Sequence, residues 1–226
     1  MNSATLLCFV HWALPKLARV EIEGREHAPA DGPVLFVFNH LGLLDIALAF
    51  LSINREDATG WVADKHKKNP LYAYLVDVVG GVWLNRENPE MSSFKQALAW
   101  LRTGGAFGVA PEGTRSHTNA LLPGKPGVAY LAAVSGVPIV PGGHTGTERM
   151  WQSWLRLRKP RLHMRFGPAF TLPPLPREGR DVALQAGIDE IMCRIAALLP
   201  EEYRGVYADY PRVQELLAET PLPSPQ

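Results

Sequence analysis

The sequence is organised around Phe38-Asn39-His40-Leu41-Gly42-Leu43-Leu44-Asp45, a short stretch that follows the apolar run Val34–Phe38. On one continuous helix, five residues would point His40 and Asp45 about 140° apart. The two side chains can therefore meet only if His40 lies in a turn before a helix and Asp45 lies in the first helical turn. Gly42 permits such a turn because it has no Cβ to restrict φ.

A histidine beside a carboxylate has the chemistry of a general base. The carboxylate fixes the imidazole tautomer through one ring nitrogen and leaves the other nitrogen free to accept a proton. A carboxylate in a first helical turn also faces the positive end of the helix dipole. The alternative is that His40 and Asp45 form a chance pair, since one histidine and one aspartate at this spacing occur in many chains. The rest of the sequence must decide between the two interpretations.

Length and composition indicate one large globular domain. The chain has 226 residues, 46% of them apolar, and a formal net charge of +1, which gives no indication of nucleic-acid binding. Cys8 and Cys193 lie far apart and match no metal or redox spacing, which is typical of a reducing cytoplasm. No Cys/His cluster is present in the sequence, so we expect no metal.

The N-terminal residues 6–14 are apolar except for His11. This run is shorter than the about 20 residues that a spanning helix needs, and no positive residue precedes it as in a signal peptide. It is either a helix packed on the domain or an interfacial helix with Trp12 at the level of lipid headgroups. We therefore divide the chain into an apolar N-terminal helix (1–18), one domain (19–220) and a Pro-rich tail (221–226) expected to be disordered.

Strands alternate with helices along the whole domain. The predicted strands cover 19–24, 34–38, 60–63, 81–84, 106–110, 137–140 and 161–166, and the last of them alternates like an edge strand. The predicted helices cover 44–52, 69–78, 88–102, 126–135, 184–198 and 211–219, with a loop rich in Gly and Trp after residue 140. The pattern predicts an α/β fold, a single domain with a largely parallel mixed sheet of about seven strands covered by helices.

Polar residues follow the C-terminal ends of several predicted strands. In a parallel sheet the crossover connections place all of these strand ends at one edge, so the polar residues should gather there. The residues concerned are His40, Lys65, Arg86, Glu112 and Arg115. A base together with cations would suit an anionic substrate that must also lose a proton. Each has a structural alternative: Arg86 could pair with a neighbouring glutamate, Lys65 could belong to a solvated charge run, and residues 112–115 could form an ordinary turn.

Four blocks of the sequence resemble the glycerophosphate acyltransferase superfamily, most closely its bacterial 1-acyl-glycerol-3-phosphate acyltransferases. They occur in order as NH with Asp45 (39–45), GGVWLNR (80–86), PEGTRS (111–116) and VPIVP (137–141). The departures are Gly42 for a common Ser, Ala110 for an aromatic residue, Trp83 for Phe and Asn85 for Asp. They leave every residue with an assigned chemical role in place, and they leave the identity of the acceptor open.

The resemblance implies transfer of a fatty acyl group from a thioester, on acyl carrier protein or coenzyme A, to the hydroxyl of a lysophospholipid. His40 would be the base and Asp45 its partner. The acceptor would be bound by Arg86, Glu112, Gly113, Thr114, Arg115 and, more weakly, Lys65, with Glu112 bonding either glycerol hydroxyls or nearby backbone. The pocket would be shaped by Gly81, Trp83, Val137 and Pro138, and residues 137–141 would also line the acyl path.

The resemblance also implies where the protein works. It would lie peripherally on the cytoplasmic side of the inner membrane, and it would need no cofactor besides the acyl donor. Glycerol 3-phosphate, another lysophospholipid or an ornithine-type lysolipid remain alternative acceptors. A non-catalytic lipid-binding protein on the same scaffold is the more distant alternative.

Overall fold

The central strand β2 (Val34–Phe38) divides the protein into two hydrophobic cores. All five of its residues are buried in the computed structural model, which describes residues 2–42, 44–85 and 91–219. Leu35 and Val37 enter one core, and Val34, Phe36 and Phe38 enter the other. This two-sided burial was predicted from the continuous apolar run, because a strand under helices on both faces does not alternate.

Within the described residues, seven strands form one sheet in the order β1-β7-β6-β2-β5-β3-β4. Neighbouring strands are parallel except β6 and β7, which pair antiparallel. The strands are β1 (Arg19–Glu23), β2, β3 (Ala58–Ala63), β4 (Val82–Leu84), β5 (Ala106–Val109), β6 (Ile139–Thr145) and β7 (Arg161–Phe166). The predicted α/β class and its largely parallel mixed sheet are confirmed.

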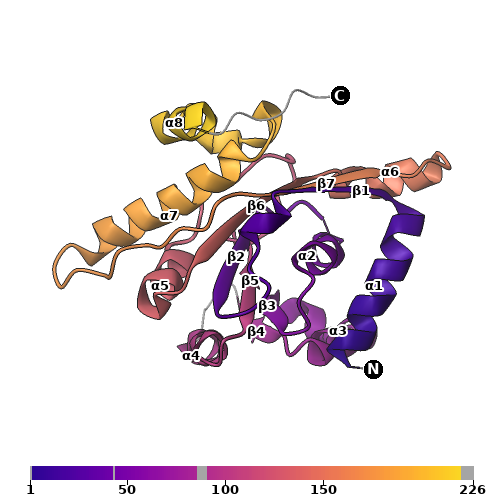
Figure 1. The fold of residues 1–226 in the computed structure, drawn as a ribbon, viewed down its shortest axis with the longest axis horizontal. Helices are drawn as coiled ribbons and strands as arrows, with labels where there is room; N and C mark the ends of the chain where they lie inside the picture. The colour runs from indigo at the N-terminus through magenta and orange to yellow at the C-terminus, as the bar shows by residue number, and fades with distance from the viewer. Residues whose placement is uncertain (1, 43, 86–90, 220–226) are drawn as a thin grey trace.

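Helices cover both faces of this sheet (Figure 1). One core contains residues from α4 (Met91–Arg102), α5 (Pro126–Ser135), α7 (Arg180–Ala197) and α8 (Pro211–Glu219). The other contains residues from α1 (Ser3–Leu17), α2 (Asp45–Ile53) and α6 (Met150–Leu155). The remaining helices are α3 (Pro70–Val78) and the short 3₁₀ turns η1 (Arg25–His27), η2 (Asp64–Lys68), η3 (Thr147–Arg149), η4 (Glu201–Tyr203) and η5 (Gly205–Tyr207).

Local sequence signals explain where several helices begin and end. The side chain of Asn69 caps α3 by accepting a hydrogen bond from the backbone N–H of Tyr72, and Pro70 follows as the first helical residue. Helix α5 also has a proline, Pro126, as its first residue, but no side chain caps it. Gly136 ends that helix with a φ of +65°, a conformation that glycine adopts without strain. The predicted start of α4, at residues 88–90, lies outside the described residues.

The region after residue 140 differs from its prediction in three ways. Strand β6 continues to Thr145 instead of ending at Val140, and the predicted loop contains helix α6. Strand β7 lies between β1 and β6, so the prediction of an edge strand was wrong. Its alternation arises because Leu162, Met164 and Phe166 face a core while the intervening residues are more exposed.

Helix α1 is half buried. Leu7 and Leu14 are buried, with Leu14 in the core shared with α2, while Phe9 and Trp12 are exposed. None of the helices in the described ranges has the length and apolar character required to cross a membrane. The predicted disordered tail, 221–226, lies outside those ranges.

Candidate active site

His40 lies in the loop that connects the central strand β2 to α2, and its backbone is fixed on both sides. Its N–H donates to Oε1 of Glu112 at 2.8 Å, and its carbonyl accepts from the N–H of Ser116 at 2.9 Å. Both partners belong to the loop after β5, the neighbouring strand in the sheet. The loop after β5 therefore holds the histidine at the edge of the sheet.

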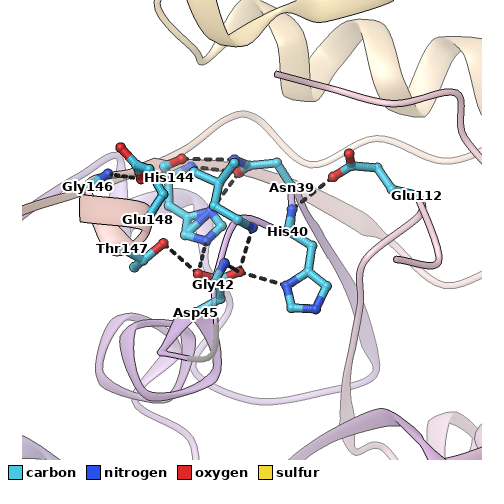
Figure 2. A network of polar contacts seen from close by, with 10 residues as sticks. Asn39, His40, Gly42, Asp45, Glu112, His144, Gly146, Thr147 and Glu148 are labelled. Carbon is cyan, nitrogen blue, oxygen red and sulfur yellow. Dashed lines mark hydrogen bonds and ion pairs between the residues drawn. The ribbon is translucent and has the colours of Figure 1, made fainter. Parts of the chain in front are cut away.

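The imidazole of His40 contacts the carboxylate of Asp45. Nδ1 lies 2.7 Å from Oδ2, and Asp45 is the first residue of α2. Since a carboxylate can only accept, Nδ1 carries the proton and Nε2 keeps its lone pair. Figure 2 shows this second nitrogen pointing away from the network, and the side chain retains 17% of its exposure. The turn followed by a first helical turn is the geometry predicted from the spacing; the catalytic role of the pair stays a prediction.

Asp45 is buried and accepts hydrogen bonds from four groups. Oδ2 also accepts from the backbone N–H groups of Leu41 and Gly42, both at 2.8 Å, and Oδ1 accepts from the hydroxyl of Thr147 at 2.6 Å. Burial alone would raise the pKa of this carboxyl, but the hydrogen bonds from His40 and Thr147 oppose it, and the pKa lies below its ordinary value. Asp45 is therefore held as an anion.

A second histidine, His144 on β6, is fully buried behind Asp45 (Figure 2). The amide of Asn39 pairs with the backbone of His144 through two hydrogen bonds of 2.9 Å, which fixes the orientation of that amide. The amide oxygen then lies 2.7 Å from Nδ1 of His144, so Nδ1 must be the protonated nitrogen.

Nε2 of His144 lies 3.0 Å from Oδ1 of Asp45, but the contact lacks hydrogen-bond geometry and leaves this buried nitrogen without a hydrogen-bond partner in the described part of the chain. Burial lowers the pKa of the His144 imidazole, and the charge of Asp45 opposes that shift only in part. A neutral His144 thus presents a lone pair to the carboxylate.

Glu112 connects two loops and is itself buried. Oε1 accepts from the backbone N–H of His40, and Oε2 accepts from the N–H of Leu122 at 2.9 Å. Burial raises the pKa of its carboxyl to about 7, although the two backbone hydrogen bonds oppose that shift. Of the two alternatives for this residue, the structure shows the bond to backbone; binding of the acceptor by Glu112 stays a prediction.

The remaining residues of the PEGTRS block lie in the same loop. Gly113 has a φ of +68°, which explains the glycine, and the side chain of Lys125 packs over it. Thr114 is exposed, and Arg115 is partly exposed. Among the described residues the Arg115 guanidinium has neither an ion pair nor a hydrogen bond, so it is available for an anionic ligand.

The predicted residues next to β3 and on or beside β4 lie farther from His40 in the sheet order. Lys65 lies exposed in η2, directly after β3, the second strand from β2. The ring of Trp83, on β4, lies 5.5 Å from Nζ of Lys67. Gly81 directly precedes β4, and a Cβ on it would lie 2.6 Å from the side chain of Val76. Arg86 lies outside the described residues.

Val137 and Pro138 lie far from His40. In the parallel register of β2 and β6, Leu35 pairs with Ile139 and Phe38 pairs with Gly142. Residues 137 and 138 therefore lie near the start of β2, about 20 Å along the strand from the level of His40. From there they do not contact His40, and their role in shaping the pocket and the acyl path stays a prediction.

The sequence analysis missed three residues near the candidate site, two of which lie on or directly after β6. His144 and Thr147 lie on and after the part of β6 that was predicted to be loop. Lys125, beside the PEGTRS loop, also received no role. A strand extended to Thr145 would have placed His144 at the level of His40, since Phe38 pairs with Gly142 and the register advances one residue at a time. Among the described residues, no cluster of His, Cys, Asp and Glu could hold a metal ion.

A sequence profile of the acyltransferase family matches residues 19–145, more than half of the chain. The chain belongs to the acyltransferase family. The match spans the sheet from β1 to β6 and includes His40, Asp45, Glu112 and His144, so the geometry described above lies inside the family's domain. The resemblance inferred from the four blocks is confirmed.

Two similar proteins are 1-acyl-sn-glycerol-3-phosphate acyltransferases from a plant and a bacterium. The Cocos nucifera enzyme is 33% identical over 62% of this chain and 46% of its own length. The Bacillus subtilis enzyme is 27% identical over 56% of this chain and 63% of its own. The chain thus spans between about half and two thirds of the length of these relatives.

A solved structure shares the fold. The 1-acyl-sn-glycerophosphate (LPA) acyltransferase PlsC from Thermotoga maritima superposes with a TM-score of 0.62, at 22% identity. The match covers 84% of this chain and 76% of that one. It confirms the predicted fold of this acyltransferase-family chain.

Proposed function

We propose that this protein transfers a fatty acyl group from an acyl thioester to the free hydroxyl of 1-acyl-glycerol-3-phosphate, which gives phosphatidic acid. The observation that carries the proposal is the 2.7 Å contact between His40 Nδ1 and Asp45 Oδ2 at the end of the central strand. The family membership supplies the reaction class, and the names of the relatives supply the acceptor.

His40 acts as the general base in this proposal. Its Nε2 removes the proton of the acceptor hydroxyl while the hydroxyl oxygen attacks the thioester carbonyl. When the resulting tetrahedral intermediate collapses, the C–S bond breaks and the thiolate leaves with the proton from His40. A histidine suits both steps because its ordinary pKa, about 6.5, lies close to neutral pH.

Asp45 fixes the tautomer of His40 and stabilises the imidazolium that forms, as an aspartate does in hydrolase triads. Thr147 and the N–H groups of Leu41 and Gly42 hold Asp45 in place. Those two N–H groups are committed to the carboxylate, so the donors that stabilise the thioester oxyanion come from elsewhere or from the substrates.

Cations at the same edge of the sheet bind the acceptor phosphate. Arg115 is the strongest candidate, because its guanidinium is unpaired within the described ranges and can bind phosphate oxygens bidentately. Arg86 and the more distant Lys65 remain candidates from the sequence, and the packing of Lys125 over Gly113 adds another. Glu112 orders the loop that carries Arg115.

The donor is an acyl thioester of acyl carrier protein or coenzyme A, and the reaction needs no other cofactor. The acceptor is an amphipathic lipid, so the protein works peripherally on the cytoplasmic side of the inner membrane. Glycerol 3-phosphate, another lysophospholipid and an ornithine-type lysolipid are the alternative acceptors, and non-catalytic lipid binding is the remaining alternative.

The test is acyl transfer from a labelled acyl thioester to lysophosphatidic acid, with glycerol 3-phosphate assayed in parallel. We expect phosphatidic acid from the wild type, a fall in kcat of about 10³-fold or more in His40→Ala, and a similar fall in Asp45→Asn, as in enzymes with this base and partner. His117→Ala, which changes an exposed histidine, is the matched control.

Each alternative has its own result. Turnover with glycerol 3-phosphate alone would keep the mechanism and change the acceptor. Lysolipid binding without turnover, in detergent and in vesicles and with both donors, would make the protein a lipid-binding member of the family.

A further inference from the structure

The stretch from Arg149 to the first residue of β7, Arg161, places large apolar side chains in solvent. In this stretch, residues 149–161, which we call the α6 segment, Trp151 is 65% exposed, Leu155 is 85% exposed and Leu157 is 97% exposed. Met150 anchors the segment in the core beside α2. Exposed apolar residues are ordinary when scattered singly, but a group of large ones on one short element marks an interaction surface.

The α6 segment is also strongly basic. It contributes a charge of +5 to a chain whose formal net charge is +1, and the sequence has no Asp or Glu between residues 149 and 177. The basic side chains, all exposed, are Arg149, Arg156, Arg158, Lys159 and Arg161. The remainder of the chain is therefore acidic by four charges, so the positive charge is local.

Helix α1 continues this surface. The indole N–H of Trp154 donates to the backbone carbonyl of Leu17 at 3.0 Å, which joins α6 to the C-terminal end of α1. Figure 1 shows α6 projecting beyond the end of the sheet next to that end of α1. On α1, Trp12 is exposed and lies under the ammonium of Lys16, 3.6 Å from the ring centroid.

We propose that the α6 segment is a membrane-docking element that binds an anionic lipid surface, with the exposed end of α1 beside it. Trp and Leu side chains between arginines and lysines are the residues that lie at the boundary of headgroups and acyl chains. The cations match the negative charge of such a surface. An acidic protein would use the charges, but it would give no reason for a leucine that is almost fully exposed on a projecting helix.

The docking element adjoins the candidate active site. Thr147, whose hydroxyl binds Asp45, precedes the buried anchor Met150 by three residues. Docking by α6 therefore brings the His40 edge of the sheet close to the lipid from which an amphipathic acceptor is drawn. This link to catalysis rests on the proposed function, whereas binding to lipid can be measured without turnover.

The experiment is co-sedimentation of the full-length chain with vesicles of phosphatidylcholine, with and without phosphatidylglycerol. We expect the wild type to bind the anionic vesicles more tightly. Replacing Arg156, Arg158 and Lys159 together by Gln should lower the partition coefficient on anionic vesicles about a hundredfold, because each cation near such a surface contributes about fivefold.

A second variant tests the apolar part. Replacing Trp151, Leu155 and Leu157 together by Ser should weaken binding by about tenfold or more. The matched control replaces Val182 and Val206 by Ser, since these exposed residues lie on α7 and η5. Circular dichroism of each variant confirms that it is folded, and turnover of a short-chain, monodisperse acceptor should remain at the wild-type level.

Three results would overturn the proposal. The wild type could fail to bind either vesicle, the triple-Ser variant could bind as the wild type does, or the triple-Gln variant could keep vesicle binding while losing activity with an acidic carrier-protein donor. The last result would assign the surface to that protein. If vesicle binding behaves as expected but acyl transfer fails with every substrate, only the proposed function is wrong.

Discussion

The buried carboxylate of Asp45 makes more contacts within the candidate site than any other side chain described above. It contacts a possible base, two backbone N–H groups, a hydroxyl and a second imidazole, and these come from segments about a hundred residues apart. The contact with His144 differs from the rest because the nitrogen that faces Asp45 carries no proton. A neutral imidazole there has a measurable effect on stability.

Replacing His144 by Leu should change how stability depends on pH. Burial keeps the pKa of the folded His144 below 6.5, so on acidification the unfolded chain takes up a proton that the folded protein does not. The His144 side chain therefore makes the free energy of unfolding fall as the pH drops below about 6.5. Urea unfolding at pH 7.5 and 5.5 should show a smaller fall for His144→Leu than for the wild type.

His117→Leu is the control for this measurement, because His117 is exposed. It should keep the pH dependence of the wild type. Equal falls in the wild type and in His144→Leu would mean that folding leaves the pKa of His144 unchanged, and a larger fall in His144→Leu would mean that His144 is protonated in the folded protein and forms an ion pair with Asp45.

At the scale of elements, the loop between β5 and α5 determines where His40 lies. It contacts His40 twice, through Glu112 and through Ser116, and Glu112 in turn holds Leu122 at the far end of the loop. Each carboxylate oxygen of Glu112 accepts a hydrogen bond from a backbone N–H, so replacing either oxygen by an NH₂ group would place two hydrogen-bond donors against each other. The loop should therefore respond strongly to the loss of one acceptor.

Glu112→Gln should destabilise the protein by about 1–3 kcal/mol at pH 5, because its amide nitrogen must face a backbone N–H. In the wild type the carboxyl pKa rises from 4.5 to about 7 on folding, so wild-type stability falls as the pH rises through this window. The Gln variant lacks that fall, so the difference in unfolding free energy between wild type and variant should change by about 2.5 kcal/mol between pH 5 and pH 8, and the stability advantage of the wild type should be lost at pH 8. Urea unfolding at both values measures it.

The same variant distinguishes the two roles considered for Glu112. If the carboxylate acts by positioning His40, kcat should fall while KM stays near the wild-type value. A rise in KM at unchanged kcat would instead place Glu112 on the acceptor. Glu56→Gln, at an exposed glutamate, should leave both stability and kinetics unchanged.

Strand β6 shows why part of the site could not be predicted. Pro141, Gly142 and Gly143 normally end or weaken a strand, so the prediction stopped at Val140. In the structure the glycines serve close packing: a Cβ on Gly142 would lie 2.4 Å from the ring of Phe38, and one on Gly143 would lie 2.9 Å from Leu198. The contacts that require them come from distant residues, which local sequence patterns do not report.

At the scale of the whole molecule, hydrophobic patterning was enough to predict the seven strands but not their order. The continuous run 34–38 indicated a central strand, and the polar residues after apolar strands indicated the edge that carries the site. Strand β7 lies inside the sheet, and β1 and β7 both run opposite to the other five strands. Both features depend on pairing between residues that are far apart in the sequence. The alternating pattern of β7 reports one exposed face and does not distinguish an edge strand from an internal one.

The sheet order predicts the sequence of events in refolding. Strand β2 pairs with β5 and β6, whereas β1 pairs with β7, and Glu23 meets Arg165 across 142 residues. Since pairings across long loops form slowly, the amides of β1 should become protected after those of β2 and β5. Pulse-labelling hydrogen exchange during refolding measures this. Protection of β1 in the same phase as β2, or before it, would contradict the prediction.

The pairing of β1 with β7 has a further consequence while the chain is being made. A ribosome adds about 5–20 residues per second, so roughly 7 to 30 s separate the emergence of Glu23 from that of Arg165. Throughout that interval β1 has no partner strand, and α1, with Phe9 and Trp12 on its outer side, is tethered to an unfinished sheet. The pairing of β1 with β7 is thus among the last contacts of the sheet that can form.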